Sequence, residues 1–177
     1  MRTADVDILL VPGRPDPSPD HWISRWERSL RTASLVTPPA SPTELPAWSA
    51  NLAGRAAQGP RPSLIVAHGA GASLIADSAG ELAAAGVIGA IIVAPLTTGD
   101  PHSSPQPLAF PSIVIASRTS PDMPFEDAAD LARAWGAEIV DAGEAGGIDD
   151  ASGHGPWPEG LMRLGWFLKR IASTKLQ

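Results

Sequence analysis

Cysteine is absent from this chain of 177 residues, and basic residues are few and scattered. The lack of cysteine excludes disulfide bonds, thiolate metal sites and a cysteine nucleophile. The formal net charge is -6, and no stretch carries the dense Lys and Arg content that nucleic acids or anionic membrane surfaces attract. We therefore expect neither a nucleic-acid partner nor a membrane partner.

Long apolar runs are missing as well. The longest, residues 87–96, is too short to span a bilayer. Acidic Asp5 and Asp7 stand where a signal peptide needs its apolar core. We expect a cytoplasmic location.

Because no linker or repeat divides the sequence, and its length suffices for one core, residues 1–177 are predicted to form a single domain.

Motifs for cofactors and metals are also lacking. The four histidines do not have ligand spacing and have no cysteine partners. The segment from His68 to Leu74 lacks the third glycine of a dinucleotide fingerprint, and no phosphate-loop lysine is found. We expect no metal, no cofactor and no bound nucleotide.

What the chain does contain is an alternation of apolar runs with amphipathic segments. Strands are predicted at residues 6–12, 35–37, 63–67, 87–94, 112–117 and 138–140, and helices at residues 21–30, 45–57, 73–85, 125–135 and 158–172. This order is typical of an α/β fold, a three-layer α/β/α sandwich with a mostly parallel sheet. In such folds the ligand site lies beyond the carboxyl ends of the strands.

The stretch LIVAHGAG, from Leu64 to Gly71, predicts a buried strand that runs into a tight turn and then a helix. This is the architecture of the nucleophile elbow of α/β-hydrolases, where a serine occupies the apex. The apex here is Gly69, which has no side chain to attack a carbonyl. The later loops, where an acid and a histidine are needed, offer Ser120 and Gly147 instead.

Motifs spread over nearly the whole chain resemble the small serine hydrolases grouped with retinoblastoma-binding protein nine and the bacterial YdeN type. The motifs are Pro12-Gly13, PDHW at 19–22, AHGAG at 67–71, ASRTSP at 116–121, GGID at 146–149 and SGHGPWPEG at 152–160. The resemblance implies a minimal α/β-hydrolase core without a cap domain. It also implies that Gly69, Ser120 and Gly147 replace the family's serine, aspartate and histidine.

The chain is therefore interpreted as a catalytically degenerate serine hydrolase, a pseudoenzyme, that binds a small acyl or carbonyl ligand or a protein partner. In the resembled fold the oxyanion hole consists of backbone N–H groups, here those of Arg14 and Ala70, which survive the loss of side chains. The residues expected to contact a ligand are Arg14, His21, His68, Gly69, Ala70, Ser120, Gly147 and His154.

Three further points stay open. His68 is either a relocated base or a packed, hydrogen-bonded residue at the end of a strand, and His154 either takes part in chemistry or anchors its loop. The rival function is an active, carboxylesterase-like serine hydrolase with displaced catalytic groups. Such groups would be Ser73 or Ser104, paired with His102 or His154.

Overall fold

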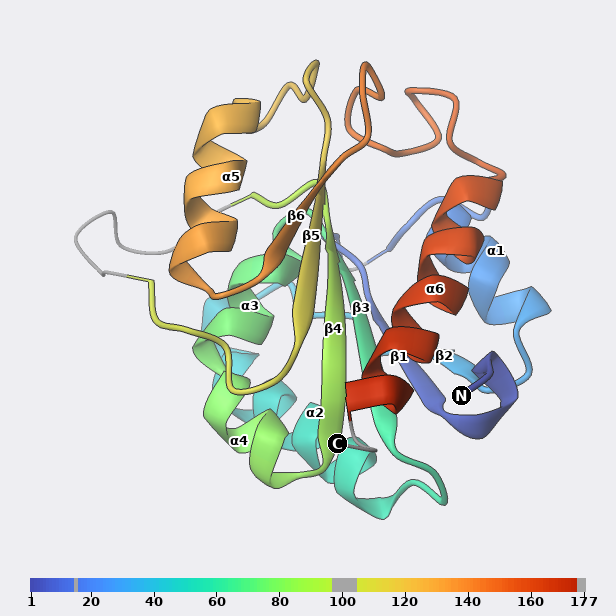
Figure 1. Ribbon diagram of the computed structural model, residues 1–177. Coiled ribbons are helices and arrows are strands. Elements are labelled where there is room, and N and C mark those ends of the chain that lie inside the picture. Colours follow the sequence, from blue (N-terminus) through green and yellow to red (C-terminus); the bar gives the residue numbers. More distant parts are fainter. Residues whose placement is uncertain (15, 97–104, 175–177) are drawn as a thin grey trace.

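A single six-stranded sheet organises the computed structural model, which describes residues 1–14, 16–96 and 105–174 (Figure 1). The strand order is β2-β1-β3-β4-β5-β6, and every neighbouring pair is parallel. The strands are β1 (Asp7–Val11), β2 (Ala33–Leu35), β3 (Ser63–His68), β4 (Val87–Val93), β5 (Ser112–Ala116) and β6 (Glu138–Asp141). The prediction of an α/β fold with a parallel sheet is confirmed.

Helices cover both faces of the sheet (Figure 1). One face carries α1 (Trp22–Ser29) and α6 (Pro158–Thr174). The other face carries α2 (Leu45–Gln58), α3 (Gly71–Asp77), α4 (Ala79–Ala84) and α5 (Phe125–Ala134). Short 3-10 turns, η1 and η2, occupy Thr3–Asp5 and Pro42–Glu44. Within the described ranges, no helix is long and apolar enough to cross a membrane.

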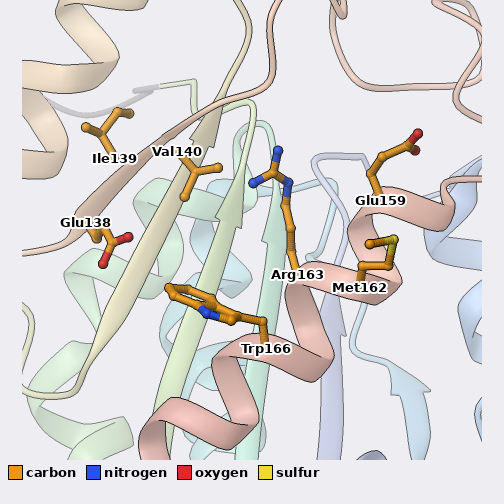
Figure 2. A pocket seen from close by; sticks show the side chains of 7 residues that line it. All are labelled: Glu138, Ile139, Val140, Glu159, Met162, Arg163 and Trp166. Carbon is orange, nitrogen blue, oxygen red and sulfur yellow. The ribbon is translucent and has the colours of Figure 1, made fainter.

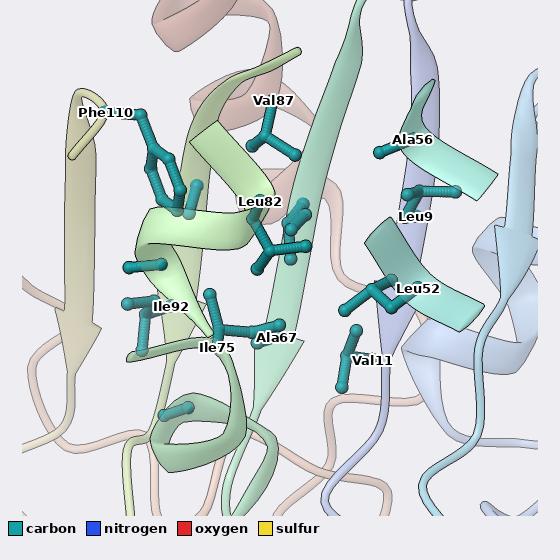
Figure 3. Packing of buried hydrophobic residues seen from close by; sticks show 14 of the residues in the cluster. Leu9, Val11, Leu52, Ala56, Ala67, Ile75, Leu82, Val87, Ile92 and Phe110 are labelled. Carbon is teal, nitrogen blue, oxygen red and sulfur yellow. The ribbon is translucent and has the colours of Figure 1, made fainter. Parts of the chain in front are cut away.

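The core lies in two layers, one on each side of the sheet. Side chains of a strand alternate between its faces, so Leu64 and Val66 of β3 join the cluster under α1 and α6, while Ile65 and Ala67 join the cluster under α2 to α4. Figure 3 shows the second cluster, in which Ile75 of α3 lies beside Ala67. Because both faces are covered, the central strands are apolar at almost every position.

Two local predictions were wrong. The helix expected over residues 73–85 is divided into α3 and α4, because Ser78 leaves the helical conformation at φ −102° and ψ 6°. Its hydroxyl shares a 2.6 Å hydrogen bond with the hydroxyl of Ser49 in α2. The strand expected at 35–37 is β2, which lies two residues earlier because its register is set by pairing of Ala33 with Ile8 of β1.

Candidate functional site

The turn between β3 and α3 has the backbone shape of a nucleophile elbow. Its apex, Gly69, has a φ of +56°, in the left-handed region that a side chain rarely adopts. The Gly69 N–H donates to the Val93 carbonyl at 3.0 Å, and the Gly69 carbonyl accepts from the N–H groups of Ala72 and Leu96, both at 3.1 Å. These bonds fix the position of residue 69 beyond the carboxyl end of β3. Because this residue is glycine, no side chain projects from that position.

The loop after β1 closes on this elbow. A Cβ added at Gly13 would lie only 2.9 Å from the His68 carbonyl oxygen and 3.2 Å from the Ala70 nitrogen, so the two loops meet backbone to backbone. They do so between β1 and β3, where the strand order reverses, which is the place where open α/β sheets bind ligands. Neither the Arg14 nor the Ala70 N–H has a backbone acceptor among the described residues.

The loop after β6 brings Gly147 to the same place. The Gly147 carbonyl oxygen lies 2.9 Å from His68 Nε2. The next residue, Ile148, is fully buried and has a φ of +49°, which is strained for a β-branched side chain. Trp22 Nε1 donates to the Ile148 carbonyl at 2.8 Å. Buried contacts therefore hold this loop in a strained shape although position 147 carries no base.

Hydrogen bonds tie the loop after β5 to the loop after β6. Thr119 Oγ1 accepts from the Gly146 N–H at 3.0 Å, and the buried Ser117 Oγ accepts from the Ala145 N–H at 2.9 Å. Ser120 Oγ accepts from the N–H groups two and three residues further on, at 3.3 and 3.4 Å, and so serves its own turn. The loops that carry Gly69, Ser120 and Gly147 thus gather at one end of the sheet.

A carboxylate occupies the space that a side chain at position 147 would need. A Cβ added at Gly147 would lie 2.7 Å from Asp149 Oδ2. The other oxygen, Oδ1, accepts from the Ser152 N–H at 2.9 Å and from the Ser152 hydroxyl at 2.8 Å. Burial opposes ionisation, but these hydrogen bonds from Ser152 outweigh it and lower the pKa of the Asp149 carboxyl. Sequence reasoning missed Asp149 as a residue of the site, although it belongs to the GGID motif at 146–149.

Two histidines lie in contact under the elbow. The rings of His21 and His68 are 4.9 Å apart between centroids and nearly perpendicular, at 71°. Burial, and after it the neighbouring His68, lower the pKa of His21 to about 4. Burial also lowers the pKa of His68, against the opposing effects of the Gly147 carbonyl and Asp149. Both rings are therefore neutral at pH 7.

The hydrogen bonds of these two rings assign their protons. A carbonyl only accepts, so His68 donates Nε2–H to Gly147. His21 Nδ1 accepts from the Ile23 N–H at 3.1 Å and caps the start of α1, so the proton of His21 is on Nε2. The bond to Gly147 favours the interpretation of His68 as a packed residue at the end of a strand.

The remaining candidates are bound within their own surroundings. His154 Nδ1 lies 3.3 Å from the Ser152 hydroxyl of the same loop, and Ser73 Oγ donates to the Leu96 carbonyl at 3.1 Å. Two other candidates of the rival function, His102 and Ser104, lie outside the described residues. In the described ranges no group of three or more His, Asp or Glu residues could hold a metal ion.

Two hollows of the surface lie away from this site. The larger, about 560 Å³, is a groove between β6 and α6 (Figure 2). The smaller, about 190 Å³, lies between α2 and α3 near Trp48. None of the eight residues expected to contact a ligand lines either hollow.

Comparison with known proteins identifies one family and one fold. The model of the serine hydrolase family matches residues 8–166. A solved structure described as a YdeN-like hydrolase from Pectobacterium atrosepticum is 30% identical, with a TM-score of 0.84 over 96% of this chain and 94% of that one. The ydeN gene product of B. subtilis is 18% identical, with a TM-score of 0.71 over 93% and 99%. Est1E from Butyrivibrio proteoclasticus, solved with ferulic acid, is 11% identical, with a TM-score of 0.68 over 94% and 89%. No curated protein matches the chain.

Proposed function

Because the chain belongs to the serine hydrolase family, we propose that it is a catalytically degenerate member that binds a small acyl or carbonyl ligand. The observation that carries this proposal is the backbone of Gly69. It has the left-handed conformation and the fixed hydrogen bonds of an elbow apex, yet it bears no hydroxyl. A frame of this kind positions a ligand but forms no acyl-enzyme.

The acid and the base of a catalytic triad are also missing, in addition to the nucleophile. This is a second reason to expect no turnover. Ser120 carries no charge that would orient an imidazolium, and Gly147 carries no base. Members of a catalytic triad act as a unit, so removal of all three leaves only the contribution of binding and of the oxyanion hole. The nearby His68 donates its Nε2 proton to a backbone carbonyl and is not placed to accept one at that atom.

The charges around the site favour a neutral carbonyl group over a free carboxylate. The N–H groups of Ala70 and Arg14 offer donors to a carbonyl oxygen, as in an oxyanion hole. The Asp149 carboxylate lies beside position 147, and its lowered pKa keeps it ionised at neutral pH. Repulsion from this carboxylate disfavours an anionic ligand, so we expect esters and amides to bind better than acids.

Two measurements on the wild-type protein test the proposal. A fluorophosphonate probe is expected to label no serine, and a thermal-shift series is expected to show larger stabilisation by small esters and amides than by the matching carboxylic acids. Labelling of one serine in a 1:1 ratio, or turnover of an ester, would overturn it.

Restoration of the triad tests whether only the side chains have been lost. The triple variant Gly69→Ser, Ser120→Asp and Gly147→His places a histidine Cβ 2.7 Å from Asp149 Oδ2, so the new imidazole must displace that carboxylate. We expect weak esterase activity from the triple variant and more when Asp149→Ala is added. The same four changes with Gly69→Ala in place of Gly69→Ser form the matched control. Equal activity in the two quadruple variants would mean that the new serine is not the nucleophile.

A further inference from the structure

Helix α6 presents a stripe of exposed and half-buried residues along the open edge of the sheet. Glu159, Met162, Arg163 and Trp166 follow the spacing i, i+3, i+4, i+7, which places them on one side of the helix. Met162 is 74% exposed and Trp166 is 47% exposed. Among the described residues, one other large hydrophobic side chain is similarly exposed, that of Leu161. It lies on the opposite flank of the same helix, because it follows Glu159 by two positions. We call the four residues the α6 stripe.

A groove runs beside the α6 stripe. It has a volume of about 560 Å³ and lies between the stripe and β6, the last strand of the sheet. Figure 2 shows the Arg163 side chain reaching into it toward Val140, with the Trp166 ring at one end and Met162 on the far wall. Apolar side chains exposed beside a groove in this way mark a surface that binds another molecule.

The two charged side chains of the α6 stripe form no ion pair within the described part of the molecule. Glu138, at the edge of the groove, is paired with Arg170. Glu159 and Arg163, one turn apart, form no salt bridge with any residue of the described part of the chain. Arg163 is near enough to the Asp141 carboxylate to help lower its pKa, but neither charged group of the stripe is held in an ion pair by a described residue, so each can still pair with a group of opposite charge on a partner.

We propose that the α6 stripe pairs with the same stripe of a second copy of this chain. Two α6 helices that cross antiparallel about a twofold axis near Met162 bring Glu159 of each copy close to Arg163 of the other. A twofold interface requires such self-complementary contacts, each made twice. Met162 of each copy then enters the groove of the other beside Trp166, and the exposed apolar surface becomes buried.

Addition of an extended peptide to the edge strand fits this surface less well. Strand β6 has only four residues, and charged residues occupy both of its ends. Glu138 pairs with Arg170 and Asp141 pairs with Arg118, so both ends are covered by long side chains. Short, charged edges of this kind discourage strand addition. The helix surface rather than the strand edge is therefore the part that docks.

Charge exchange provides the decisive test. Glu159→Arg places two bases on the stripe, and Arg163→Glu places two acids on it, so each single variant repels its own copy. We expect each variant alone to be monomeric and a 1:1 mixture to form a heterodimer, measured by size-exclusion chromatography with light scattering. Circular dichroism checks that both variants retain their helices, as expected because Glu159 is exposed and Arg163 is only half-buried.

Met162→Gln and Leu161→Gln form a matched pair of uncharged variants. Both remove an exposed apolar side chain from α6, but only Met162 belongs to the stripe. We expect Met162→Gln to weaken self-association by at least about tenfold and Leu161→Gln to leave it unchanged. A wild-type protein that stays monomeric up to millimolar concentration would overturn the proposal and leave the groove to a different occupant. A dimer that all four variants form equally well would also overturn it, because its interface would lie elsewhere.

Discussion

The variant Gly69→Ser tests the backbone strain at the elbow and the catalytic role of a hydroxyl there in two separate measurements. Gly69 has a φ of +56°, and a Cβ added there would meet one described atom within 4 Å, the Cα of Gly13 at 3.7 Å. That distance is an ordinary van der Waals contact. The cost of Gly69→Ser is therefore the backbone cost of a left-handed residue alone, about 1–2 kcal/mol.

A thermal melt makes this cost visible. For a domain of this size, 1 kcal/mol shifts the melting temperature by about 2–4 °C, so Gly69→Ser is expected to lower it by about 2–8 °C. Gly54→Ala serves as a control. Gly54 lies inside α2 with no atom within 4 Å of an added Cβ, and alanine there is expected to raise the stability by about 0.5–1 kcal/mol. The two glycines should thus respond with opposite signs.

Turnover is the second readout of the same variant. Gly69→Ser restores a hydroxyl but neither a base at position 147 nor an acid at position 120, so hydrolysis of p-nitrophenyl acetate should remain at the level of Gly69→Ala. A higher melting temperature would refute the argument from backbone strain. Esterase activity from this single change would refute the argument that the three positions act together.

The remaining predictions concern the buried ring nitrogens under the site. Trp22→Phe removes the Nε1 donor that bonds the buried Ile148 carbonyl at 2.8 Å, whereas Nε1 of Trp48 has no partner in the described part of the chain. In urea unfolding Trp22→Phe should therefore cost about 1–3 kcal/mol more than Trp48→Phe, and equal losses would contradict this. The pKa of His21 is lowered from 6.5 to about 4, so the unfolded chain binds a proton that the folded ring does not, and stability should fall as the pH drops from about 6.5 toward 4. His21→Asn keeps an acceptor for the Ile23 N–H, and its stability should fall less over the same range; an unchanged pH slope would count against the buried ring as the cause.

Most of the fold could be predicted because burial on both faces leaves a strong pattern. Strands β3, β4 and β5 are continuous apolar runs, and each was predicted within one residue at either end. Strand β2 was misplaced by two residues because an edge strand is half-buried and its register depends on β1. The division between α3 and α4 was missed because it depends on a contact of Ser78 with a distant helix.

The place of the candidate site followed from the sequence, since Gly69, Ser120 and Gly147 lie in the loops that follow three of the parallel strands, β3, β5 and β6. The content of the site did not follow. Asp149 is two residues from Gly147 in the chain, and only the turn of the loop returns its carboxylate to the empty space. The groove beside α6 was also missed, because its walls come from β6 and from a helix some twenty residues later.

Sequence alone determined the alternation of elements, the parallel sheet and which residues stand at positions 69, 120 and 147, because hydrophobic period, apolar content and residue identity are local properties of the chain. Tertiary structure decided which side chains meet: the Asp149 carboxylate beside Gly147, the strained loop held by Trp22, and the exposed stripe on α6. Such contacts depend on how loops and helices from distant parts of the chain come together, and residue order does not encode those distances in any local pattern.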